Sequence, residues 1–116
     1  MRILALDRDL LFRSKIDAAA SQAASTVQAA PDAASLARAL AGAPADVAVL
    51  DLESDAADPF GQIAAIQAAW PSTPILGYCS HAQVELQHRA RQAGCAWAGP
   101  RSGFLEALTQ HLSARP

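Results

Sequence analysis

A short apolar run between two aspartates, Asp46-Val47-Ala48-Val49-Leu50-Asp51, constrains the fold of this chain more than any other stretch. Four consecutive apolar residues between turn-forming segments are typical of a strand that is buried on both faces of a sheet. Asp51 ends this strand, and open α/β sheets place their ligand crevice at the carboxyl ends of their strands. A lone aspartate at this position is most simply a loop cap, so its role depends on the residues that end the neighbouring strands.

Four other short apolar stretches predict further strands, with helical patterns between them. The predicted strands cover residues 2–6, 25–29, 47–50, 74–78 and 95–98. The first helical pattern begins with Leu10, Leu11 and Ile16, another begins at about Pro59, and Ala93-Gly94 ends a later one. Five strands that alternate with five helices predict a flavodoxin-like α/β fold, with a parallel sheet in the order 2-1-3-4-5 and helices on both faces.

Composition limits the classes of function. A length of 116 residues predicts one domain, residues 1–116, and a formal charge of -2 argues against direct nucleic-acid binding. No apolar run approaches the ~18 residues of a membrane-spanning helix. The apolar start of the chain ends at Asp7, too early for a signal peptide, and the two cysteines lack CxxC spacing. We therefore expect a soluble, cytoplasmic protein with reduced thiols and no contact with a membrane.

The predicted strand order brings several reactive side chains to one crevice. The crevice lies beside the first strand and above the third, because the strand order reverses there. The residues expected at this edge are Asp7, Arg8, Asp51, Cys79, Ser80 and, from beyond the fifth strand, Arg101.

Along its whole length the chain resembles the receiver domains of two-component response regulators. The opening strand with its polar cluster, Ile3 to Asp9, is similar to the family's first strand, and Val47 to Leu52 is similar to the strand that carries its phosphoacceptor. Three further features match the family in content and spacing: the segment 70–76, the Ala93-Gly94 pair and the basic residue Arg101 before a helix. No single motif is specific to the family, but five motifs in the family's order and spacing are.

The resemblance implies phosphoryl transfer from a histidine kinase to Asp51, assisted by magnesium. The resemblance aligns the family's first acid with Asp7. The family's second acid, which is the more direct metal ligand, is replaced by Arg8. The family's hydroxyl position falls on Cys79 and its lysine on Arg101. The aromatic position of the fifth strand falls on Ala98.

These departures predict a degenerate site, as in a pseudo-receiver. Arg8 is expected to pair with Asp51, because at ~4 Å and an effective dielectric constant of ~20 the attraction is of order 4 kcal/mol before desolvation. Asp7 and Asp51 remain weak candidate metal ligands, so Mg²⁺ is expected only if the altered site still binds it, and no other cofactor is implied. Asp9 and Ser80 are candidate substitutes for the missing ligand and the missing hydroxyl. The resulting hypothesis is a phosphorylation-independent protein-interaction module that is not an enzyme.

The resemblance also implies a partner surface, on the fourth helix, the fifth strand and the last helix. This face includes Trp97, and tryptophan is enriched among residues that dominate binding energies. The expected occupant is a histidine kinase, a downstream signalling protein or a second copy of the chain.

An enzyme is the alternative hypothesis, and it centres on Cys79 in Tyr78-Cys79-Ser80-His81. A cysteine that leaves a parallel strand just before a helix is similar to the nucleophile of rhodanese-like sulfurtransferases and cysteine phosphatases. Those loops carry glycine and arginine close to the cysteine, whereas residues 82–85 here read Ala-Gln-Val-Glu. An enzyme of this kind would need a Cys79 thiol with a pKa well below ~8.5.

Overall fold

A parallel sheet forms the centre of the computed structural model, which describes residues 1–7, 9–53 and 58–114. The described strands are five and follow the order β2-β1-β3-β4-β5. Their bounds are β1 (Arg2–Leu6), β2 (Thr26–Ala29), β3 (Val47–Asp51), β4 (Ile75–Cys79) and β5 (Trp97–Pro100). The predicted flavodoxin-like fold and its strand order are confirmed.

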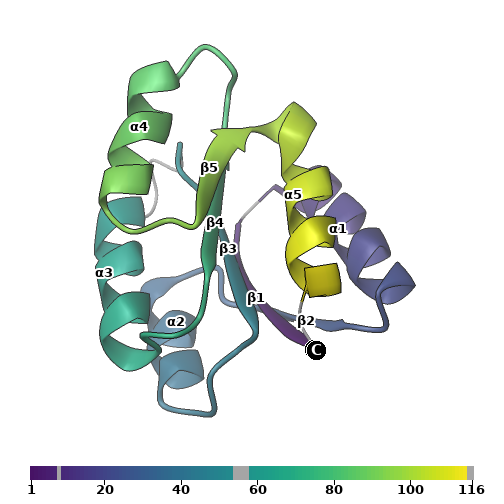
Figure 1. The fold of residues 1–116 in the computed structure, drawn as a ribbon. Helices are drawn as coiled ribbons and strands as arrows, with labels where there is room; N and C mark the ends of the chain where they lie inside the picture. The colour runs from purple at the N-terminus through teal and green to yellow at the C-terminus, as the bar shows by residue number, and fades with distance from the viewer. Residues whose placement is uncertain (8, 54–57, 115–116) are drawn as a thin grey trace.

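Helices cover both faces of this sheet (Figure 1). On one face lie α2 (Ala33–Leu40), α3 (Pro59–Ala69) and α4 (Val84–Gln92), and on the other lie α1 (Leu10–Gln22) and α5 (Arg101–Ala114). Within the described ranges, no helix has both the length and the apolar character that crossing a membrane requires.

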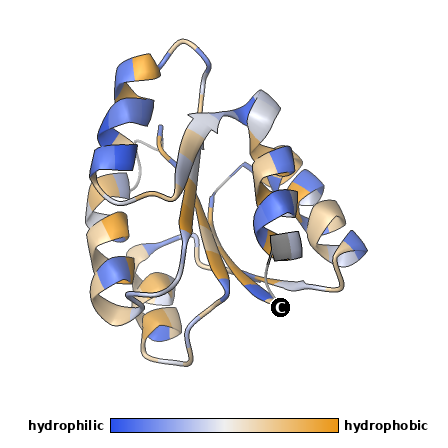
Figure 2. Cartoon of the chain, viewed as in Figure 1, coloured by the Kyte–Doolittle hydropathy of each residue, from blue (hydrophilic) through white to orange (hydrophobic). Residues whose placement is uncertain are grey.

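Two apolar clusters, one on each face of the sheet, form the core. Along β3, Val47 and Val49 belong to the cluster beneath α1 and α5, whereas Ala48 and Leu50 belong to the cluster beneath α2, α3 and α4. All four residues are fully buried, as expected for a central strand whose side chains alternate between two covered faces. Figure 2 shows the apolar strands between helices that carry hydrophilic residues.

Local capping interactions begin and end the helices. Asp9 accepts hydrogen bonds from the main-chain N–H groups of Leu11 and Phe12 at 3.1 and 3.2 Å, so it caps α1. Asp58 caps α3 through the N–H of Gly61 at 3.1 Å. Gly94, with a φ of 117°, follows α4 in a conformation that disfavours any residue with a Cβ.

The buried face of α1 differs from the expected one. Leu10 and Leu11 are 81% and 82% exposed, and the buried residues are Phe12, Ile16 and Ala20. The four-residue spacing of this second set defines the stripe that packs on the sheet, and the first turn of the helix carries the two leucines away from it.

The fifth strand lies two residues later than predicted. Residues 95 and 96 belong to the connection from α4, where the N–H of Cys95 bonds to the carbonyl of Ala90 at 3.1 Å. Pairing with β4 matches Leu76 to Trp97 and Cys79 to Pro100. Proline is tolerated here because β5 is an edge strand and need not donate on both sides.

Candidate functional site

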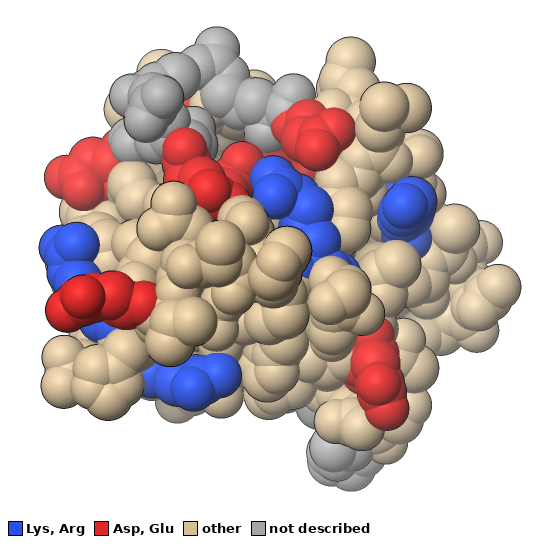
Figure 3. Space-filling view, turned by 90° about the horizontal axis from the view of Figure 1, so that it is seen from above, with Lys and Arg blue, Asp and Glu red and all other residues tan. Residues whose placement is uncertain are grey.

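The carboxyl ends of the strands bring the predicted residues to one edge of the sheet. Asp7 follows β1, Asp51 ends β3, Cys79 ends β4, and Arg101 begins α5 directly after β5. Figure 3 looks down on this edge and shows acidic side chains beside Lys or Arg side chains. The structure therefore places Asp7, Asp51, Cys79 and Arg101 at the same end of the sheet.

Asp51 is half-buried and already has two partners. Its Oδ1 accepts a hydrogen bond from the main-chain N–H of Glu53 at 2.9 Å. Its Oδ2 lies 3.7 Å from Nη2 of Arg101. Burial raises the pKa of Asp51 above its ordinary value of 3.8, although the Glu53 hydrogen bond and the Arg101 guanidinium each oppose this shift.

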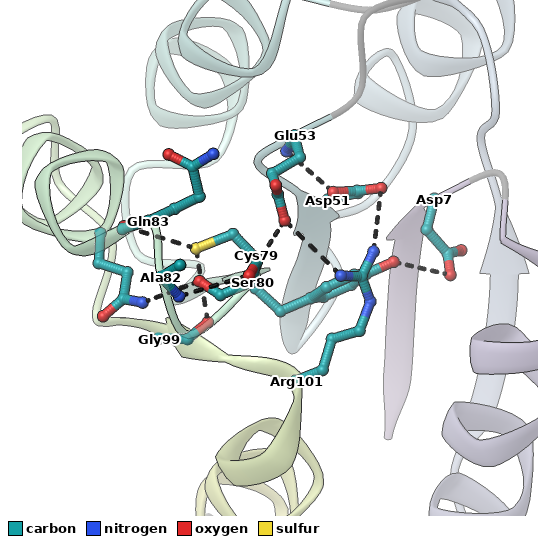
Figure 4. A network of polar contacts seen from close by, with 11 residues as sticks. Asp7, Asp51, Glu53, Cys79, Ser80, Ala82, Gln83, Gly99 and Arg101 are labelled. Atoms are coloured by element: carbon teal, nitrogen blue, oxygen red, sulfur yellow. Dashed lines mark hydrogen bonds and ion pairs between the residues drawn. The ribbon is translucent and has the colours of Figure 1, made fainter.

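Arg101 is the cation beside Asp51 among the described residues (Figure 4). Besides Asp51, its Nη1 lies 3.6 Å from Oε1 of Glu53. Its guanidinium carbon lies 5.0 Å from the centre of the Tyr78 ring and 5.9 Å from that of Phe12, so aromatic side chains also surround the cation. A planar guanidinium can satisfy two carboxylates and two rings together, which a lysine ammonium does less well.

Glu53 joins the third and fourth strands at this edge. Its Oε1 accepts a short hydrogen bond from the main-chain N–H of Ser80, and it also faces Arg101. The hydroxyl of Ser80 accepts from the N–H of Ala82 at 3.3 Å, so it is engaged in its own turn. One carboxylate thus connects the ends of β3 and β4 with the start of α5.

Asp7 is almost entirely buried, at 4% exposure. Its Oδ2 accepts a hydrogen bond from the hydroxyl of Tyr78 at 3.2 Å. Within the described part of the chain, its Oδ1 receives no hydrogen bond and has Nη1 of Arg13 at 4.0 Å. Burial is the main reason that the pKa of Asp7 is raised above 3.8, while Tyr78 and Arg13 act in the opposite direction. The same burial, together with the two aspartates, raises the pKa of Tyr78.

The predicted contact between Arg8 and Asp51 lies outside the described residues, so it stays a prediction. The cation that the structure places beside Asp51 is Arg101. Asp9, the candidate substitute ligand, uses its carboxylate as the cap of α1.

The described residues alone do not supply a complete magnesium site. Mg²⁺ requires about six oxygen ligands in a near-octahedral arrangement. Over residues 1–7, 9–53 and 58–114, no three His, Cys, Asp or Glu side chains are grouped so that they could hold a metal ion. In addition, the Arg101 guanidinium pairs with the Asp51 oxygen that a cation would need.

Cys79 does not have the surroundings of a nucleophile. Its side chain is completely buried, and its Sγ lies 3.9 Å from the carbonyl oxygen of Gly99 and 4.0 Å from that of Gln83. Burial raises the pKa of the Cys79 thiol, which is the opposite of what a thiolate enzyme needs. Cys95 is also buried, and burial raises the pKa of its thiol to about 11.

Trp97 is half-buried on β5. Its ring meets the Phe104 ring edge-on, with the centres 5.8 Å apart, so it contributes to the core beneath α5 and retains some exposed surface. Its predicted role as an interface residue stays a prediction. Ala98, which the receiver resemblance aligns with an aromatic position, is fully buried.

Sequence reasoning did not identify two residues of this site, Glu53 and Tyr78. Glu53 follows the predicted third strand and was not among the expected site residues, although its position two residues after Asp51 could have indicated the same side of the chain. Tyr78 was assigned only to a strand. A tyrosine within a fully buried strand needs a partner for its hydroxyl, and a buried carboxylate at the end of a neighbouring strand is a suitable one.

Solved structures of receiver domains share this architecture over nearly the whole chain. The receiver domain of NtrX from Brucella abortus is 18% identical, with 97% of this chain and 99% of that chain covered and a TM-score of 0.81. The signal receiver domain of the response regulator NarL from Mycobacterium tuberculosis is 24% identical, with 98% and 97% covered and a TM-score of 0.74. The chemotaxis response regulator CheY4 of Vibrio cholerae is 21% identical, with 95% and 97% covered and a TM-score of 0.76.

No protein-family profile and no curated protein sequence matches the chain. The structural likeness, with the strand order 2-1-3-4-5, assigns the fold: it is the fold of response-regulator receiver domains.

Proposed function

We propose that this chain is a cytoplasmic receiver-type signalling domain, spanning residues 1–116, that binds proteins without being phosphorylated. In this proposal Asp51 occupies the phosphoacceptor position but is held in an ion pair. The partner is a histidine kinase, a downstream signalling protein or a second copy, and the domain catalyses no reaction of its own.

The ion pair between Arg101 and Asp51 is the observation that carries the proposal. A carboxylate attacks a phosphodonor with a free oxygen lone pair, usually while a divalent cation neutralises the phosphoryl oxygens. Here one Asp51 oxygen accepts an N–H and the other faces a guanidinium. The described residues alone also do not supply a complete metal site, so both requirements of phosphorylation are poorly met.

Exposed apolar residues at the same edge support a role in protein binding. Leu10 and Leu11 begin α1 three residues after Asp7, and Val84, which is 68% exposed, begins α4 after the end of β4. Large apolar side chains with exposures this high are natural contacts for a partner, and Trp97 adds a further aromatic surface on β5.

The cysteine-enzyme alternative has weaker support. A nucleophilic thiolate must be accessible and stabilised as an anion, whereas Cys79 is buried and burial disfavours its thiolate. We therefore do not propose sulfurtransferase or phosphatase activity.

Phosphorylation with a small donor tests the proposal. The unmodified protein is incubated with millimolar magnesium and acetyl phosphate, and its intact mass is then measured. We expect no added phosphoryl group, because Asp51 is paired and the metal ligands are incomplete. Stoichiometric, magnesium-dependent addition to Asp51 would overturn the proposal.

Two variants make this experiment interpretable. Asp51→Asn removes the acceptor and shows whether any added mass lies on Asp51. Arg8→Asp supplies the acid that the receiver resemblance implies at that position, and we expect it to gain measurable magnesium binding by calorimetry.

A further inference from the structure

A single carboxylate, that of Glu53, engages two donors at the sheet edge that carries Asp51, and one of them, Arg101, also pairs with Asp51. Its Oε1 accepts the main-chain N–H of Ser80 and lies 3.6 Å from Nη1 of Arg101 (Figure 4). The Glu53 side chain is 28% exposed, so both contacts are partly shielded from water.

We propose that Glu53 is a positioning residue, the built-in anion of this site, whose carboxylate holds Arg101 and the Ser80 loop by occupying donors that a phosphoryl group on Asp51 would otherwise use. This inference rests on the proposed function, because it supplies the reason that the domain needs no phosphorylation.

The geometry indicates that Glu53 and a phosphoryl group on Asp51 would compete for the same donors. A phosphoryl group on Asp51 would add between one and two negative charges and three acceptor oxygens, which require cationic or N–H donors close by. Arg101 is the described cation within ion-pair distance of Asp51, and it is shared with Glu53. The N–H of Glu53 already donates to Asp51, and the N–H of Ser80 donates to Glu53.

The Glu53 contact also fixes the start of the connection from β4 to α4. The carbonyl of Ser80 accepts from the N–H of Gln83 at 3.0 Å and from Nε2 of Gln87 at 3.3 Å. The hydroxyl of Ser80 accepts from Ala82. The N–H, the carbonyl oxygen and the hydroxyl oxygen of Ser80 thus each have a partner at the start of the loop leading to α4.

Rescue by an added anion tests whether Glu53 acts through its charge. In Glu53→Ala, the donors on Arg101 and Ser80 lose their carboxylate. We expect sodium acetate, added at constant ionic strength, to shift the Ser80 amide resonance saturably toward its wild-type position. The unmodified protein should not respond, because its donors are occupied. Inorganic phosphate is the second probe, and it should act in the same way.

Glu53→Gln keeps the side-chain size and removes the charge. Because charge-assisted hydrogen bonds are stronger than neutral ones, we expect hydrogen exchange at the Ser80 amide to accelerate about tenfold. Glu106→Gln, an exposed change on α5, is the matched control and should leave exchange unchanged.

The inference is overturned if folded Glu53→Ala does not respond to either anion, or if Ser80 exchanges equally fast in Glu53→Gln and Glu106→Gln. These measurements use neither magnesium nor a phosphodonor. Phosphorylation of the unmodified protein would therefore refute the proposed function separately from the role of Glu53.

Discussion

At the scale of single residues, burial of the acids dominates the chemistry of the site. Asp7 lies almost out of contact with water, with one oxygen bonded to Tyr78 and the other 4.0 Å from Arg13. Desolvation outweighs these partners and raises the pKa of Asp7. The folded state therefore binds a proton at Asp7 more tightly than the unfolded chain does.

Replacing Asp7 with Asn should stabilise the protein at neutral pH. A raised folded-state pKa contributes stability below the ordinary value of 3.8, and this contribution is lost as the pH rises through the folded value. Asp7→Asn removes the charge and retains an oxygen for Tyr78. We expect Asp7→Asn to have a higher free energy of unfolding than the wild type at pH 7, measured by urea denaturation. The difference between the two proteins should become smaller as the pH falls toward 4.

Glu106→Gln, an exposed change on α5 with no hydrogen bond or ion pair to Arg13 or Asp7 in the described part of the chain, is the control and should leave the free energy of unfolding at pH 7 unchanged. Equal effects of Asp7→Asn at both pH values would contradict the raised pKa of the buried Asp7.

At the scale of the element, α1 forms one wall of the site. Phe12 on this helix packs against Tyr78, with the ring centres 4.5 Å apart, and against Phe104 at 5.6 Å. The helix begins at a single cap, Asp9, which bonds to the N–H groups of Leu11 and Phe12, and it has no acidic residue in its first turn. The position of Phe12 therefore depends on that cap.

Removing the cap with Asp9→Ala should lower the free energy of unfolding by about 1 kcal/mol. Asp9→Asn, which keeps a side-chain oxygen, should lose much less. Chemical denaturation measures both, and faster amide exchange at Phe12 should accompany the alanine change. If the two variants are equally stable, capping is not what anchors the start of α1.

At the scale of the whole molecule, the sheet separates two layers of helices, each of which covers its own apolar cluster. The clusters beneath the two helical layers share the buried strands. At one side of the sheet β5 lies between α4 and α5, and Trp97 on β5 packs with the cluster beneath α5. Because Trp97 is half-buried against Phe104, its replacement must affect both stability and any surface contact.

Trp97→Ala should weaken self-association or partner binding by more than tenfold, the range of a residue that dominates an interface. Sedimentation velocity measures the association, and circular dichroism checks that the variant is folded. Trp70→Phe perturbs the buried core beneath α3 and is the control for lost stability. Unchanged association in a folded Trp97→Ala protein would exclude this surface.

Most of the architecture was predictable because it is determined locally. A few neighbouring residues are enough to predict three of its features: the four buried residues of β3, the cap at Asp58 and the glycine after α4. Parallel strands connected by helices then require that Asp7, Asp51 and Cys79 share one edge.

Only the tertiary structure decided which side chains pair at that edge. Arg101 lies 50 positions after Asp51 in the sequence, and its contact with both Asp51 and Glu53 depends on how α5 leaves β5. The exposure of Leu10 and Leu11 differed from the expectation for the same reason, since apolar character alone does not tell which side of α1 meets the sheet. Periodicity and capping act over one or two turns of chain, whereas ion pairs act through space between distant residues. The sequence by itself therefore determined the sheet and its reactive edge, and the three-dimensional packing determined the partners of Asp51.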